Sequence, residues 1–172
     1  MEQMNDAVTK TYNTTDDAPA LELDRRLGVR REVSIDELRD INTSFYGDAL
    51  FVFAKNTEVS AWAAGDVITR TATLVKGYHG TSAGTSSTAG DVLGVAQHAI
   101  PAGYWGWILR RGMGVVAAGA GAAITTDTDL IVSAANAGTA IDFTDGEEER
   151  VFGHSLAAID AGATGLAMIN LP

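Results

Sequence analysis

The sequence predicts a mainly β fold, a compact antiparallel barrel or sandwich with an extended N-terminal arm and one short helix. From about residue 49 onward, short apolar segments alternate with turns rich in Gly, Asn and Asp. The chain has 19 glycines and only 3 prolines, a balance that suits many tight turns between short strands. Helices of roughly 10–15 residues do not separate these segments, so the pattern does not indicate a parallel α/β sheet.

The N-terminal stretch, residues 1–30, is polar and has no clean period. We expect an extended arm here, either a flexible tail or a segment that becomes ordered only on a partner. Arginines cluster at the end of this arm, and they are candidate interface residues: Arg25, Arg26, Arg30 and Arg31.

Residues 31–80 should form a helix and strands that pack on the body. In "SIDELRDI", Ser34 precedes Glu37 by three positions, the spacing of a capping box, and predicts a helix beginning after the serine. The segments "ALFVFAKN" and "EVSAWAAGDVITRTATLVKGYHG" predict strands. Alternation places Val67 and Thr69 on one face of the second segment, with Ile68 and Arg70 on the other.

Residues 81–90, "TSAGTSSTAG", consist only of Thr, Ser, Ala and Gly and predict an exposed loop at an internal boundary. Residues 91–172 then form a β module. "SLAAIDAG" within this module is also compatible with a helix. The module's predicted strand segments are "DVLGVAQHAI", "YWGWILRRG", "GVVAAG", "DLIVSA", "TAIDF", "RVFGHSLAAI" and "GLAMINL".

The aromatic stretch "IPAGYWGWILRRG" reads as a strand with two different faces. Trp105 and Trp107 share one face with Leu109, while Ile108 and Arg110 share the other. One face is expected to join the core and the other to contact a protein partner. The candidate interface residues of this strand are Tyr104, Trp105, Trp107, Arg110 and Arg111.

The net charge of the chain disfavours some classes of binding partner. The formal net charge is −10, which disfavours nucleic acid and anionic membranes because both require a basic surface. There is no cysteine and no apolar run of about 18 residues, so neither disulfides nor a membrane span is expected. The first residues lack the order of a signal peptide. We therefore expect a soluble protein made in the cytoplasm.

Catalytic and metal motifs are incomplete. "GTSAG" matches the string around a hydrolase nucleophile at Ser82, but the small polar residues that follow do not predict the required helix. The histidines at 79, 98 and 154 are single and read as hydrogen-bonded strand residues. Asp127 and Asp129 lack the rest of a calcium loop and read as turn caps. We expect no enzyme, no metal and no cofactor.

Residues 90–172 resemble a module of tailed-phage head proteins, the capsid decoration or cement proteins. The resemblance rests on the opening "GDVLGVAQHAIPAG", the strand "GYWGWILRRGMGVVAA", the segments "ITTDTDLIVSA" and "GTAIDF", and the close "RVFGHSLAAIDAGATGLAMINL". It covers about half of the chain. A longer N-terminal half and a strand heavier in tryptophan depart from the family pattern.

The resemblance implies a β-tulip-like module that assembles as a homotrimer at capsid three-fold positions, and it brings no catalytic residues. It implies a virion protein on the capsid surface that bridges major capsid protein subunits and stabilises the mature head. Alternatives are another virion component, such as a head fibre base or a tail-associated protein. A carbohydrate-binding β domain and a serine hydrolase built on Ser82 are further alternatives.

Overall fold

The computed structural model describes residues 8–15, 17–41, 44–71, 77–83, 91–146, 148 and 151–172. The predicted mainly β fold is confirmed, and the described residues form two short helices where one was expected. The elements in chain order are β1 (Thr11–Tyr12), α1 (Ala20–Arg25), β2 (Arg30–Val33), α2 (Ile35–Ile41), β3 (Ala49–Asn56), β4 (Val67–Arg70), β5 (His79–Thr81), β6 (Val92–Ala96), β7 (Trp105–Ala117), β8 (Asp129–Val132), β9 (Ala140–Asp142), β10 (Gly153–Ser155) and β11 (Thr164–Asn170).

Five of these strands close into a small barrel. They are hydrogen-bonded in the order β3-β5-β4-β6-β7, and β7 pairs back onto β3 to complete the ring. All pairs in the ring are antiparallel except β3 with β5, which is parallel and departs from the purely antiparallel expectation. Closure removes most unpaired strand edges from this part of the chain.

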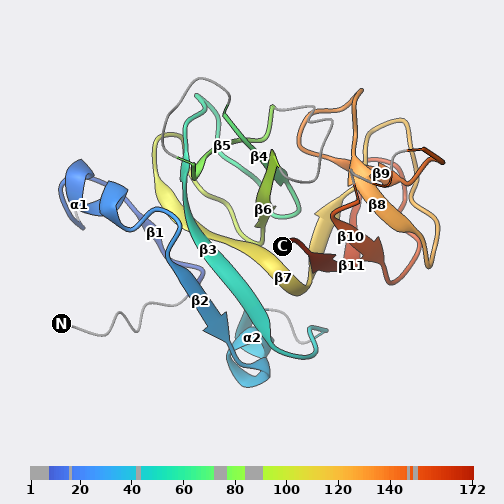
Figure 1. Ribbon diagram of the computed structural model, residues 1–172, viewed down its shortest axis with the longest axis horizontal. Helices are drawn as coiled ribbons and strands as arrows, with labels where there is room; N and C mark the ends of the chain where they lie inside the picture. Colours follow the sequence, from blue (N-terminus) through green and yellow to red (C-terminus); the bar gives the residue numbers. More distant parts are fainter. Residues whose placement is uncertain are drawn as a thin grey trace.

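Strand β7 joins the barrel to a second sheet. Its first half pairs with β3 and β6, and its second half pairs with β11, which begins the order β11-β10-β8-β9. Gly112 lies at the change of partner with φ +117, where a Cβ would be 2.8 Å from the Ala49 Cβ. The predicted segments "YWGWILRRG" and "GVVAAG" are therefore one strand that needs glycine in its middle. Figure 1 shows β7 running between the two parts.

The core is divided by the barrel wall. An inner cluster fills the barrel and comprises Val52, Ala54, Trp62, Ile68, Leu93, Ala96, Ile100 and Ile108. A larger outer cluster lies between the barrel, the N-terminal segment and the second sheet, and it includes Phe53, Trp107, Leu130 and Ile169. Alternate residues of β3 and β7 serve the two clusters, as the period of two in a strand requires.

The N-terminal segment packs on the body from residue 8 onward. Strand β1 pairs with β7, and Val8, Tyr12 and Leu23 are buried in the outer cluster. The Tyr12 ring lies edge-on to Phe53 with 5.4 Å between ring centroids. Three widely spaced apolar side chains thus anchor the described residues of this segment on the body.

Three further sequence predictions concern the helix after Ser34, the segment "SLAAIDAG" and the residues between 72 and 90. The helix after Ser34 is confirmed as α2, although Glu37 accepts a hydrogen bond from Arg31. The helical alternative for "SLAAIDAG" is wrong, because Ser155 ends β10 and Ile159 forms a bridge to Ile124. The loop expected at residues 81–90 and the strand positions 72–74 lie mainly outside the described residues.

Candidate attachment surface

The tryptophans of β7 do not form an exposed face. Trp105 and Trp107 are each 3 % exposed and belong to the outer cluster. The Trp105 indole nitrogen donates a hydrogen bond of 3.1 Å to the Asp24 carboxylate of α1, and the Lys55 ammonium lies 4.2 Å from the Trp105 ring centroid. The opposite face of the strand, with Ile108, lines the barrel interior. Both faces therefore meet this chain's own core, which corrects the expectation of one exposed face.

The other candidate interface residues lie in several places. Arg25 is exposed on α1, and Arg26 pairs with Glu22 one turn earlier at 3.3 Å. Arg31 is half-buried and pairs with Glu37. Tyr104 is half-buried against the inner cluster. Only Arg30, Arg110 and Arg111 are brought together, at one end of the barrel.

Three arginines surround this end of the barrel, and we call them the arginine mouth: Arg30, Arg70 and Arg110. Arg70 and Arg110 alternate with Ile68 and Ile108 of the inner cluster, so they point to the inner side of their strands. Arg30 of β2 lies directly opposite Val52 of β3, which belongs to the inner cluster. Because directly opposite residues of neighbouring strands share a face, Arg30 also lies on the inner side. Strands distant in sequence thus place three guanidinium groups at one opening.

Arg110 is held in place by backbone oxygens. Its Nη1 donates to the Leu93 carbonyl at 3.2 Å, and its Nε donates to the Pro172 carbonyl at 2.8 Å. Burial lowers the pKa of Arg110, the nearby charges of Arg30 and Arg70 lower it further, and Tyr78 opposes them. Arg30 and Arg70 are exposed, and neither forms an ion pair within the described part of the chain. Arg30 and Arg70 therefore bring positive charge to the mouth that no carboxylate side chain of the described residues pairs with.

One groove begins at the mouth, and a second adjoins the first. The first, about 420 Å³, is lined by Arg30, Glu32 and Arg111 together with the last residues of the chain. The second, about 570 Å³, shares Arg111 and extends to His154 and Met168 on β10 and β11. Both are open to the surface, and Glu32 is the one carboxylate lining the first among the residues described there. Apolar and charged residues share the lining of both grooves, and neither groove is an enclosed ligand cavity.

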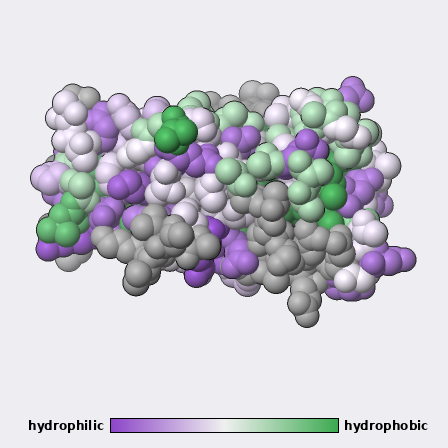
Figure 2. Space-filling view, turned by 90° about the horizontal axis from the view of Figure 1, so that it is seen from above, coloured by the Kyte–Doolittle hydropathy of each residue, from purple (hydrophilic) through white to green (hydrophobic). Residues whose placement is uncertain are grey.

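Hydrophobic residues on the exposed surface are scattered. Figure 2 shows one face on which hydrophilic and hydrophobic residues alternate, with the most hydrophobic areas small and separate. The exposed large hydrophobics of the described chain are Leu21, Val29, Tyr46, Val59, Leu156 and Met168. Single apolar residues of this kind are normal on soluble domains and do not define an interface. Charge is the more distinctive surface feature.

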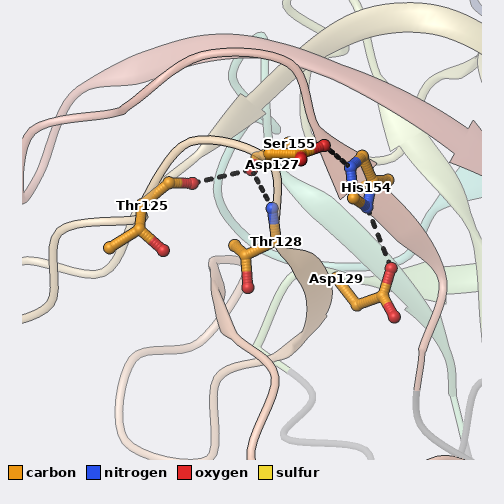
Figure 3. Close-up of polar contacts among 6 residues, drawn as sticks. All are labelled: Thr125, Asp127, Thr128, Asp129, His154 and Ser155. Atoms are coloured by element: carbon orange, nitrogen blue, oxygen red, sulfur yellow. Dashed lines mark hydrogen bonds and ion pairs between the residues drawn. The ribbon is translucent and has the colours of Figure 1, made fainter.

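His154 lies between two aspartates at the far end of the second groove, and we call this arrangement the His154 clamp. The His154 Nδ1 lies 3.0 Å from an Asp129 oxygen and its Nε2 lies 2.8 Å from an Asp127 oxygen. Figure 3 shows the imidazole between these two carboxylates, beside Ser155, which links Thr125 and Thr128. Because a neutral imidazole has one N–H, only the protonated ring donates to both carboxylates. The hydrogen bonds that the ring donates to Asp129 and Asp127 accordingly raise the pKa of His154.

We expect the His154 imidazole to titrate above its ordinary pKa of 6.5, and His98 to titrate at about 4 because its ring is desolvated. The His154 clamp stabilises the fold below pH 6.5, and this contribution is lost as pH rises through the folded-state pKa. A pH titration by NMR measures both rings in one sample. In Asp129→Asn the His154 pKa should fall, while that of His98 stays unchanged. A His154 pKa at or below 6.5 would contradict the protonated clamp.

Ser82 has a structural acceptor. Its hydroxyl donates to Glu58 at 2.8 Å, and the same carboxylate accepts from Trp62, Thr81 and Ala83. The carboxylate thus ties the strand end of β5 to the loop after β3.

Among the described residues, no group of three or more His, Cys, Asp or Glu side chains is arranged to hold a metal ion. Within the same residues, no helix has the length and apolarity needed to cross a membrane.

Comparison with known proteins gives a likeness of fold. Neither a protein-family model nor a curated protein matches the chain. The crystal structure of the N base of head fiber gp8.5 in bacteriophage phi29 matches with a TM-score of 0.51 and 19 % sequence identity. The match covers 70 % of this chain and 94 % of that chain. The two proteins share a fold. Nearly all of the phage domain finds an equivalent here, so the likeness extends over a whole domain.

Proposed function

We propose that this chain is a structural component of a bacteriophage virion and acts as a fibre base on the head. The observation that carries the proposal is the likeness to the phi29 head fibre base, which extends over 94 % of that domain. Fold alone does not fix function, so the resemblance of residues 90–172 to head decoration proteins is a second and separate support. Both support a structural component of a phage virion.

The architecture suits a rigid base. A closed barrel is fused to a second sheet through the continuous strand β7, and the N-terminal segment is held on the barrel by Tyr12, Leu23 and the Asp24 contact to Trp105. Repetition of one weak attachment over a symmetric shell gives a strong total attachment. The acidic balance of −10 keeps such a protein from binding free nucleic acid.

A cement role is the second candidate, favoured by the sequence resemblance. In that role the chain bridges major capsid protein subunits as a homotrimer and stabilises the mature head. The two roles differ in one property. A fibre base needs to attach to the head, whereas a cement protein must also make the shell harder to disrupt.

Heads that lack the protein distinguish these roles. Purified chain is added to expanded heads, and cosedimentation and the thermal disruption of the heads are measured. We expect saturable binding with a disruption temperature within about 2 °C of the untreated heads. A large rise in this temperature identifies a cement protein and overturns the fibre-base role. Absence of binding overturns both.

A further inference from the structure

The arginine mouth is an unusual feature in a chain of net charge −10. Like charges that face one another cost free energy, and Arg30 and Arg70 lie close enough to Arg110 to lower its pKa. Arg110 donates hydrogen bonds to the Leu93 carbonyl and to an oxygen of Pro172. Folding of the chain does not require the charges of Arg30 and Arg70, since both side chains are exposed. An acidic partner would remove the repulsion.

The opposite end of the strand order carries such an acidic surface. Strand β9 is the last strand of the order β2-β3-β5-β4-β6-β7-β11-β10-β8-β9, and the turn after it is acidic. We call this surface the acidic edge: Asp142, Asp145 and Glu148. Asp145 and Glu148 are exposed, and neither forms an ion pair within the described part of the chain. From residue 80 onward the sequence has 3 basic residues against 9 acidic ones.

The two surfaces of one chain cannot meet. Arg30 lies on β2 at the first position of the strand order, whereas Asp142 lies on β9 at the last. In Figure 1, β2 is at the bottom and β9 is on the opposite side of the molecule. A complementary contact between them therefore requires two copies. Such a contact joins different surfaces of identical chains, and repeated with a suitable rotation it closes into a ring.

We propose that the arginine mouth of one copy binds the acidic edge of the next, so that the chain associates head to tail with itself. Guanidinium groups recognise carboxylates through paired N–H donors, and Arg30 and Arg70 are exposed and form no ion pair with the other residues that the structure describes. The grooves beside the mouth, lined by Arg111 and Asn170, give room for the incoming turn. The proposal rests on the proposed fibre-base function and names a second copy as the partner, but its test uses purified protein and no phage heads.

Sedimentation and light scattering of the full chain test the contact. We expect an oligomer at about 0.05 M NaCl that dissociates at about 1 M NaCl, because salt screens exposed ion pairs. The variant Arg30→Glu/Arg70→Glu should weaken association by roughly tenfold or more. The variant Asp145→Lys/Glu148→Lys should do the same. Arg25→Glu, an exposed arginine on α1 away from the mouth, is the matched control and should associate as the parent chain does.

Combining all four reversals in one chain provides the decisive comparison. The substituted positions of the two surfaces are then complementary again, although Arg110 and Asp142 keep their signs, and association should be stronger than in either double variant. Arg30→Gln/Arg70→Gln removes charge without reversing it and covers the case in which the glutamates disturb folding. A parent chain that is monomeric at low salt overturns the proposal. So does a fourfold variant that folds but stays monomeric, or a pair of reversed arginines that leaves association unchanged.

Discussion

Replacing Trp62 by alanine is expected to lower the free energy of unfolding by about 4 kcal/mol, the largest effect of any single substitution considered. Trp62 is fully buried and belongs to the inner cluster of the barrel. Its ring lies against Gly80, where a Cβ would be 3.1 Å from the nearest Trp62 atom, so neighbouring residues are poorly placed to fill the space. The substitution removes apolar contacts and leaves a cavity in a closed barrel, which has little freedom to collapse.

Urea unfolding measured by circular dichroism tests this expectation. The parent chain and Trp62→Ala are compared with Val59→Ala, a change at a fully exposed apolar residue in the neighbouring loop. Val59→Ala should alter the unfolding free energy by less than about 0.5 kcal/mol. A loss below about 1 kcal/mol for Trp62→Ala would contradict the description of the barrel interior.

Glu58→Gln is expected to cost about 2 kcal/mol of stability. The carboxylate accepts from the Trp62 indole at 3.1 Å, from the Ser82 hydroxyl at 2.8 Å and from the Ala83 amide at 2.7 Å, and it also accepts from Thr81. Every one of these groups is a donor. Glutamine replaces one carboxylate oxygen with an NH₂ group, which sets a donor against donors.

The pH dependence of this loss follows from the pKa of Glu58. Burial raises that pKa, but the hydrogen bonds from Thr81, Ser82 and Ala83 outweigh burial and leave it below 4.5. The contribution of the carboxylate is therefore complete above pH 4.5 and disappears as pH falls through the folded-state pKa. Unfolding of the parent chain and Glu58→Gln should differ most at pH 7 and converge in acid. Glu32→Gln, at an exposed carboxylate, is the control; a constant difference between pH 7 and pH 3 would contradict the assignment.

Local pattern was sufficient to find most strands. Alternation and turn residues predict β3, β4, β8 and β11 close to their observed positions, because each has one face in a core. The same alternation correctly separates Val67 from Ile68, which serve the outer and inner clusters. Local reasoning also explains the glycine of β7, although it read the strand as two.

Features that depend on pairing between distant segments were not visible in the sequence. The N-terminal segment is polar on average, and its burial depends on three apolar residues that are widely spaced: Val8, Tyr12 and Leu23. Helix α1 has only six residues and follows Pro19 without a side-chain cap. Packing rather than propensity forms such a helix.

The candidate site also combines residues that the sequence singled out with residues that only strand pairing brings together. Arginines 30, 110 and 111 were singled out from the sequence, but Arg70 was read only as a strand residue. Register brings it to the mouth, since Arg70 follows Ile68 of the barrel interior. The His154 clamp likewise needs the β8–β10 register, which pairs His154 with Asp129 across 25 residues of sequence. A sequence signal for either site would require knowledge of which strands pair.

Cryo-electron microscopy of phage particles assembled in the presence of this chain tests the central proposal most directly. A fibre base predicts density for the barrel and the second sheet on the outside of the head, repeated at symmetry-related positions, with each fibre rising from it. Neighbouring copies should contact one another through the arginine mouth and the acidic edge. Density for the chain in the tail, or its absence from the particle, would contradict the proposed function.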